Sequence, residues 1–171
     1  MSGRPARILF VCMGNICRSP AAEAIFRHRM AAAGVSFEVD SAGTGGWHEG
    51  EAPDPRTQRV LLGQGIEPVG TARKVQPSDF DRFDLVIAMD RANRDDLLAA
   101  GADPSRVRLL LEWHPERRGA DVPDPYHGGD DGFRHMYRLI DRACAALLAE
   151  LAAADQAGLT RPWPIRSGRT R

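Results

Sequence analysis

The chain has 171 residues, which is enough for one well-packed domain and too few for two. Its hydrophobic fraction of 43% and its charged fraction of 27% are ordinary for a globular protein and exclude an intrinsically disordered chain. Lysine and arginine together number 23, as do aspartate and glutamate, and the resulting net charge of zero argues against general nucleic-acid binding. No apolar run approaches the roughly 18 residues of a membrane-spanning helix.

Hydrophobic patterns predict strands and helices that alternate along the chain. The N-terminal half is predicted to hold a strand, a helix, a strand and a helix, at residues 7–12, 19–33, 37–41 and 56–62. The C-terminal half is predicted to hold the same alternation, at residues 83–89, 93–100, 107–111 and 133–153. A loop rich in proline and glycine, residues 114–132, precedes the last helix.

The first helix carries recognisable signals at both ends. Ser19 followed by Pro20 predicts a side-chain cap and then a proline at the first helical position. Gly34 is typical of the residue that ends a helix in the left-handed conformation. These signals predict that the helix begins directly after a short loop that follows the first strand.

The alternation predicts one three-layer α/β domain, a four-stranded parallel sheet with helices on both faces, over residues 6–153. Ligands of such sheets bind at the carboxyl ends of the strands. Cys12 ends the first strand, so a site is expected there. Residues 154–171 contain four arginines, two prolines and two glycines and are predicted to form a flexible basic tail.

The segment between the first strand and the first helix has the composition of an anion-binding loop. Five residues separate Cys12 from Arg18, and Gly14 and Asn15 tolerate the left-handed backbone of a tight curl. The backbone N–H groups of the loop are expected to point at one centre, in line with the N-terminus of the helix. Candidate binding residues are therefore Met13, Gly14, Asn15, Ile16 and Cys17.

The positive end of this helix also acts on the cysteine. A thiol beside an arginine at a helix N-terminus is expected to ionise at neutral pH, so Cys12 is a candidate nucleophile. Arg18 offers a planar fork that matches two phosphate oxygens. Ser19 is positioned to donate its hydroxyl to the sulfur. Without its context, a cysteine and an arginine at this spacing would be a weak signal, and Cys12 would simply end a buried strand.

The string VCMGNICRSPAAE at residues 11–23 resembles the active-site signature of low-molecular-weight protein tyrosine phosphatases. The resemblance extends, in order, to residues 41–48, 52–56, 88–93 and 124–126, and covers the chain from about 6 to 153. It implies a flavodoxin-like strand order and hydrolysis of phosphotyrosine in proteins or peptides through a cysteinyl phosphate on Cys12.

The proposed reaction also needs a proton donor for the leaving oxygen. Asp121, Asp124 and Asp130 lie in the loop before the last helix, and the residues alone do not choose among them. The resemblance implies Asp124 as the general acid and base. It also places Trp47, His48 and Tyr126 around the mouth of the pocket, where aromatic walls would favour phosphotyrosine; packing in the core is the alternative for Trp47.

Cys17 lies on the same loop as Cys12, so a reversible disulfide between them is a hypothesis for protection against over-oxidation. Its alternative is a small loop residue without a redox role. Cys144 lies in a helical stretch rich in alanine and leucine and is read as a buried hydrophobe. No Cys-x-x-Cys pair or histidine pair occurs at ligand spacing, so neither a metal nor a cofactor is expected.

Two positions depart from the pattern of the family. Many relatives carry a histidine where this chain has Gly70, and that histidine supports the loop together with Asn15 and a serine that matches Ser41. The tyrosine of the Asp-Pro-Tyr motif is often followed by a second tyrosine, whereas His127 follows it here. The supporting network is therefore expected to be weaker or to use other partners.

Three other functions share parts of this pattern. A protein arginine phosphatase resembles the chain closely but has a smaller threonine where this chain has Ile16. An arsenate reductase needs further cysteines, and a phosphotyrosine-binding pseudophosphatase would have lost a catalytic residue. We expect a monomer without nucleic-acid or membrane partners, and a cytoplasmic location because the N-terminal apolar run lacks a cleavage site.

Overall fold

The computed structural model describes residues 5–158, which form a single α/β domain around one parallel sheet. The sheet has the order β2-β1-β3-β4, which confirms the predicted flavodoxin-like arrangement. Its four strands are all parallel and are β1 (Arg7–Cys12), β2 (Glu38–Gly43), β3 (Leu85–Ala88) and β4 (Val107–Leu109).

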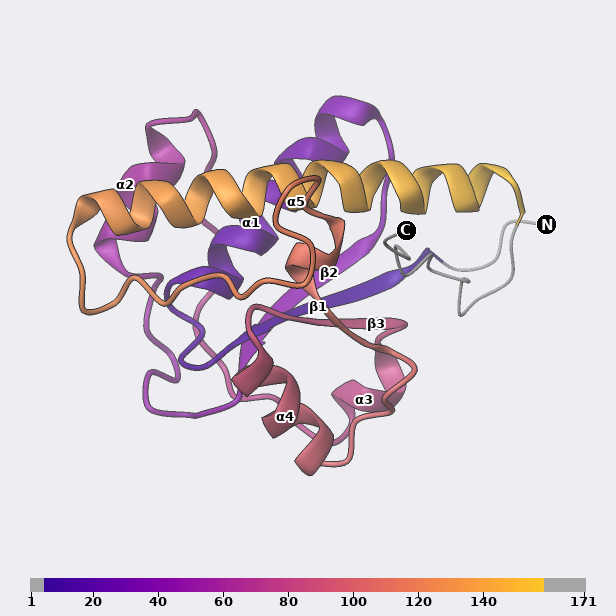
Figure 1. Ribbon diagram of the computed structural model, residues 1–171, viewed down its shortest axis with the longest axis horizontal. Coiled ribbons are helices and arrows are strands. Elements are labelled where there is room, and N and C mark those ends of the chain that lie inside the picture. Colours follow the sequence, from indigo (N-terminus) through magenta and orange to yellow (C-terminus); the bar gives the residue numbers. More distant parts are fainter. Residues whose placement is uncertain (1–4, 159–171) are drawn as a thin grey trace.

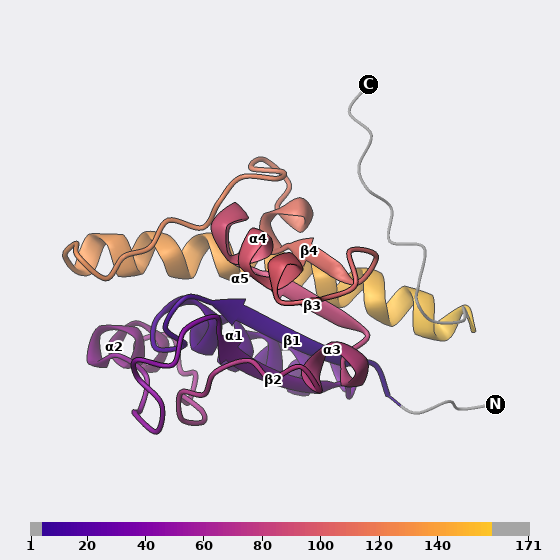
Figure 2. The same cartoon turned by 90° about the horizontal axis from the view of Figure 1, so that it is seen from below.

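Helices cover both faces of the sheet, as Figures 1 and 2 show. On one face lie α1 (Arg18–Ala33), α2 (Pro55–Leu62) and the long α5 (Asp130–Gln156). On the other face lie α3 (Asp79–Arg82) and α4 (Arg91–Ala99). A 3₁₀ turn, η1 (Leu110–Trp113), follows β4 and packs against α5. The predicted three-layer architecture is confirmed.

The central strand β1 contributes to both cores because its side chains alternate between the two faces. Ile8 and Phe10 pack into the larger core with α1 and α5, while Leu9 and Val11 pack into the smaller core with α4. All four side chains are fully buried. A strand buried on both faces explains why β1 reads as one continuous apolar run, and it holds Cys12 rigidly at its end.

Some element boundaries differ from the prediction. Helix α1 begins at Arg18 with Cys17 at its N-cap position, and no side chain caps it, so the predicted cap by Ser19 is wrong. The Ser19 hydroxyl lies among Cys12, Asn15 and the Ala42 carbonyl instead. The predicted stop at Gly34 is confirmed by its left-handed φ of 66°.

The C-terminal half shows three further differences. The single-turn helix α3 was not predicted, β4 ends at Leu109 because the chain turns into η1, and α5 is longer at both ends than residues 133–153. Most of the predicted basic tail lies outside the described residues, although its first residues continue α5. None of the helices within residues 5–158 is both long and apolar enough to cross a membrane.

Candidate active site

The candidate active site is built on the loop that joins β1 to α1. Thr44 and Gly45 donate backbone N–H groups to the carbonyls of Cys12 and Met13 at 2.9 Å, which ties this loop to the segment after β2. A Cβ atom on Gly43 would lie 2.7 Å from the Met13 carbonyl oxygen, so only glycine permits this approach. Asn15 has a φ of 57° and is the one non-glycine residue with a positive φ between residues 5 and 158. The predicted curl of the loop is present.

Cys12 lies at the floor of a pocket and is almost completely buried. Its sulfur is 3.0 Å from the Ser19 hydroxyl oxygen, as the sequence predicts. Cys17, also buried, lines the same pocket. Burial, followed by the nearby charges of Asp54 and Cys12, raises the pKa of Cys17 to about 12, so Cys17 is a neutral thiol at physiological pH.

Arg18 enters the pocket from the first turn of α1, and its side chain is only 3% exposed. Its Nη1 donates to the Asp90 carboxylate at 2.6 Å and to the Val122 carbonyl at 3.0 Å. Burial opposes its charge, but the Cys12 sulfur, Asp90 and Asp124 together raise the pKa of the guanidinium above its ordinary value. A buried cation held in this way is oriented before any anion arrives.

Asp90 was not among the predicted site residues. It follows β3 at the carboxyl edge of the sheet and caps α4 by accepting the Asn93 N–H at 2.7 Å. One carboxylate therefore both begins a helix and fixes Arg18. Its position, directly after a buried strand and before a helix, is the sequence signal that could have identified it.

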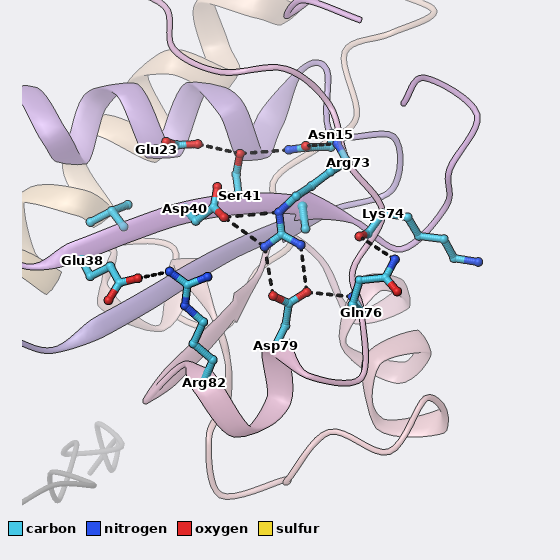
Figure 3. Close-up of polar contacts among 12 residues, drawn as sticks. Asn15, Glu23, Glu38, Asp40, Ser41, Arg73, Lys74, Gln76, Asp79 and Arg82 are labelled. Carbon is cyan, nitrogen blue, oxygen red and sulfur yellow. Dashed lines mark hydrogen bonds and ion pairs between the residues drawn. The ribbon is translucent and has the colours of Figure 1, made fainter. Parts of the chain in front are cut away.

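A network of buried polar groups supports the back of the loop (Figure 3). The Asn15 amide donates to the hydroxyls of Ser19 at 2.8 Å and Ser41 at 3.0 Å, and its carbonyl oxygen accepts the backbone N–H of Arg73 at 3.0 Å. Ser41 in turn donates to Glu23 at 2.8 Å. All hydrogen-bonding groups of the Asn15 side chain are therefore satisfied.

This network forms although Gly70 stands where a histidine was expected to support the loop. Burial raises the pKa of Glu23 above its ordinary value, although hydrogen bonding to Ser41 and pairing with Arg27 act in the opposite direction. Glu23 and the Arg73 backbone thus serve as the other partners that the sequence analysis anticipated.

The guanidinium of Arg73 fastens its own segment to the sheet. It donates to Asp79 at 2.9 and 3.1 Å and to Asp40 at 3.0 and 3.3 Å, as Figure 3 shows. The Gly43 N–H donates to the Arg73 carbonyl at 2.8 Å, and Gly43 forms an isolated parallel bridge with Lys74. Residues 73–75 therefore lie along the edge of β2, where they hold Asn15 in place.

The loop before α5 forms the opposite wall of the pocket. Asp124 lines the pocket, and its carboxylate lies 3.7 Å from Nη2 of Arg18. Asp121 accepts hydrogen bonds from Arg91, and Asp130 pairs with Arg59; neither lines the pocket. The geometry therefore separates Asp124 from the other two candidates.

Arg56 holds this loop and was not predicted as a site residue. It donates to the backbone carbonyls of Tyr126 at 3.0 Å and Gly128 at 3.1 Å, and its guanidinium lies 4.4 Å from the centre of the Phe133 ring. Asp54, the cap of α2, binds the same guanidinium. Long-range contacts of this kind leave no local pattern in the sequence.

Three side chains with rings line the pocket, namely His48, Tyr126 and His127, and the ring centroids of His48 and Tyr126 are 6.3 Å apart. Trp47 lies outside the lining of this pocket, with 72% of its surface exposed, so it neither packs in the core nor forms a wall of the pocket.

The other predicted binding residues divide into two groups. Met13, Gly14, Ile16 and Cys17 line the pocket, whereas Asn15 and Ser19 support it from behind. The part of the chain that the structure describes contains no group of three or more histidine, cysteine, aspartate or glutamate residues arranged to hold a metal.

Comparison with known proteins places the chain in a family. Residues 7–157 match the model of the low molecular weight phosphotyrosine protein phosphatase family. A low molecular weight protein-tyrosine-phosphatase from Streptomyces coelicolor is 50% identical over 151 residues, which cover 84% of this chain and 92% of that protein.

Solved structures of phosphatases also match the fold of this chain. The crystal structure of YfkJ from Bacillus subtilis matches with a TM-score of 0.85 and 42% identity over 91% of this chain and all of that chain. The Drosophila arginine phosphatase DARP matches with a TM-score of 0.77 and 34% identity over 84% of this chain and 96% of that chain. On the family match and these identities, the chain belongs to the low molecular weight phosphotyrosine protein phosphatase family.

Proposed function

We propose that the protein hydrolyses phosphotyrosine in proteins or peptides through a phosphorylated cysteine. The observation that carries the proposal is the convergence of the Cys12 sulfur, the Arg18 guanidinium and the Asp124 carboxyl group on one pocket. These groups supply a nucleophile, an anion-binding cation and a proton donor, which are the three functions that the reaction needs.

In the first step, the Cys12 thiolate attacks phosphorus and forms an S–P bond while the bond from phosphorus to the tyrosine oxygen breaks. The Asp124 carboxyl group gives its proton to that oxygen, and tyrosine leaves as the neutral phenol. The position of Asp124 across the pocket from Cys12, beside Arg18, supports this role. One proton moves, and the phosphoryl group stays on the sulfur.

In the second step, water attacks phosphorus and the Asp124 carboxylate accepts a proton from it. The S–P bond breaks, inorganic phosphate leaves and the thiolate is restored. The Ser19 hydroxyl, 3.0 Å from the sulfur, is placed to donate to the departing thiolate. The backbone N–H groups of the loop, the N-terminus of α1 and the fork of Arg18 stabilise the equatorial phosphoryl oxygens in both steps.

The walls of the pocket favour an aryl phosphate. The rings of His48 and Tyr126 line the pocket, and Ile16, nearly buried, fills part of the lining. A flat phenyl ring contacts such walls along its whole length, whereas a phosphoserine side chain is too short to bring its phosphorus to Cys12 from the same backbone position. The bulk of Ile16 is the feature that argues for phosphotyrosine over phosphoarginine, the substrate class suggested by the name of the Drosophila relative.

The test is turnover of para-nitrophenyl phosphate and of a phosphotyrosine peptide by wild type, Cys12→Ser and Asp124→Ala. Cys12→Ser should turn over neither substrate. Asp124→Ala should lose about 10²- to 10⁴-fold on the peptide and less on para-nitrophenyl phosphate, because nitrophenolate is a weaker base that needs less help to leave. Asp130→Ala, which removes an exposed carboxylate from the first turn of α5, is the matched control and should keep full activity.

Two results would contradict the proposal. Activity in Cys12→Ser would exclude Cys12 as the nucleophile, and equal losses in Asp124→Ala and Asp130→Ala would exclude Asp124 as the acid. A phosphoarginine peptide measured beside the phosphotyrosine peptide decides the substrate class: a higher kcat/KM on phosphoarginine would show that Ile16 does not select as proposed.

A further inference from the structure

A second cavity lies beside the active-site pocket and shares Met13 with it. We call it the Trp47 groove. Apolar side chains make up most of its lining: Met13, Trp47, Val75, Pro77, Phe80 and Leu97. None of the steps proposed above uses this groove. It therefore needs a separate explanation.

The wall formed by Trp47 is exposed yet held in place. The indole rests so closely on Gly45 that a Cβ atom there would lie 1.7 Å from the ring. Gly45 in turn donates its N–H to the Met13 carbonyl at 2.9 Å, so the segment that carries Trp47 is attached directly to the catalytic loop. An aromatic side chain that is 72% exposed and leans on backbone is available for contact with another molecule.

Exposed apolar side chains gather at this part of the surface. Among residues 5–158, the large hydrophobic side chains classed as exposed are Met13, Trp47, Leu62 and Tyr126. Three of these four line the pocket or the groove beside it. Their continuity across Met13 indicates one contact surface for one partner, with the Cys12 pocket inside it.

Hydrogen bonds hold the floor of the groove in place. Val75 donates its N–H to the Gly43 carbonyl at 2.8 Å, which continues the pairing of residues 73–75 with the edge of β2. Figure 3 shows Asp79, at the start of α3, bound by Arg73 and by the backbone N–H of Gln76. Leu97 adds a fully buried side chain from α4. A partner would therefore bind a preformed surface, so no free energy of binding would be lost in ordering it.

The rim carries little net charge, because exposed Lys74 and exposed Asp96 both line the groove. This balance argues against selection of an acidic or basic side chain. An apolar side chain is the chemistry that the groove fits.

We infer that the Trp47 groove binds an apolar side chain of the substrate polypeptide, one to three residues from the phosphotyrosine. The inference rests on the proposed function. An extended chain advances about 3.3 Å per residue, so a peptide that places its phosphotyrosine in the Cys12 pocket crosses Met13 within a few residues. The pocket then binds the phosphorylated ring, and the groove binds the side chain of a neighbouring residue.

The test uses phosphotyrosine peptides in which all neighbours are glycine except for one leucine, placed in turn at each of three positions on either side. One position should raise kcat/KM about tenfold over the all-glycine peptide, which is the effect of burying roughly half of a leucine side chain. The ratio of the two kcat/KM values is the readout, so changes in the chemical step cancel.

Ala100→Phe is designed to fill the groove, which Ala100 lines from the exposed end of α4. It should lower the ratio from about ten to about one. Ala99→Phe is the matched control: the neighbouring alanine is also exposed but does not line the groove, and the ratio should stay near ten. Trp47→Ala removes a wall and should lower the ratio as well.

Equal kcat/KM for the leucine and glycine peptides in the wild type would overturn the inference while leaving the proposed function intact. No turnover of any peptide would overturn the proposed function. In that case, affinity of the Cys12→Ser protein for the same peptides still decides whether the groove binds leucine. A ratio unchanged in Ala100→Phe, together with an altered sedimentation coefficient, would assign the groove to self-association and would also overturn the inference.

Discussion

Replacement of Arg73 by methionine should reduce both stability and turnover, because its guanidinium joins two carboxylates beneath the catalytic loop. Asp79 is 7% exposed in its side chain and would retain only the Gln76 N–H, while Asp40 is 39% exposed and would return to water. Leaving a buried carboxylate unpaired costs about 3–5 kcal/mol, and the partial exposure of Arg73 reduces this to about 2–3 kcal/mol. A domain of this size should then melt roughly 4–12 °C lower.

The effect on turnover follows from the backbone of the same residue. The backbone N–H of Arg73 donates to the side-chain carbonyl oxygen of Asn15 at 3.0 Å. The hydrogen bonds around Asn15 stabilise the positive φ of this residue. With the segment loosened, Ser19 and Cys12 lose part of their alignment, and kcat should fall about tenfold with a smaller change in KM. Urea unfolding and steady-state kinetics on para-nitrophenyl phosphate measure the two effects.

Arg82→Met is the matched control, since Arg82 pairs with the partly exposed Glu38 on the same side of the molecule and does not touch Asn15 (Figure 3). It should cost at most about 1 kcal/mol and leave kcat unchanged. In an Asn15→Ala background, Arg73→Met should no longer reduce kcat, because the residue through which it acts is gone. If the two substitutions reduce kcat independently, Arg73 stabilises the fold without positioning the loop.

Three further substitutions test separate parts of the site. Asp90→Asn removes the charge that orients Arg18 and should lower kcat/KM for para-nitrophenyl phosphate by about 10- to 100-fold, with inorganic phosphate inhibiting less strongly. Burial raises the pKa of Glu23, so the folded protein binds that proton more tightly, and stability should fall as the pH rises from the unfolded-state pKa through the folded one. Glu23→Gln should remove this slope from urea unfolding free energies measured between about pH 4 and pH 7. Peroxide should oxidise Cys12 to a sulfenic acid, from which the Cys17 sulfur displaces water to form a disulfide that dithiothreitol reverses; Cys17→Ser should lose that recovery.

The catalytic loop could be predicted from the sequence because its determinants are local. A β-branched apolar run, a glycine and an asparagine at the curl, and a proline in the first helical turn are neighbours in the chain. The alternation of these local elements predicted the parallel sheet with helices on both faces, whereas the strand order came from the resemblance to the family. The predicted helix cap by Ser19 is wrong because the Ser19 hydroxyl contacts the Cys12 sulfur instead.

The residues that hold the site could not be predicted in the same way. Asp90 is 72 positions from Arg18, and Arg56 is 70 positions from the Tyr126 carbonyl that it binds. Each pair forms only because the fold brings the carboxyl ends of different strands to one edge. An arginine with a carboxylate two positions away, as Arg56 has in Asp54, reads as a local surface pair until its other contacts are known.

The location of the Trp47 side chain differs from the one expected from the sequence, and one through-space contact is the reason. Gly43, Gly45 and Gly46 leave the direction of the following side chain open, because glycine restricts the backbone little. The indole settles on Gly45 and faces the groove over residues 75–80, while His48, the next residue, takes the wall of the pocket. Adjacent side chains thus line two cavities that meet at Met13. A single peptide that carries a phosphotyrosine and an apolar neighbour would satisfy both, whereas a small aryl phosphate satisfies only one, and the two substrates should respond differently to changes on the groove side.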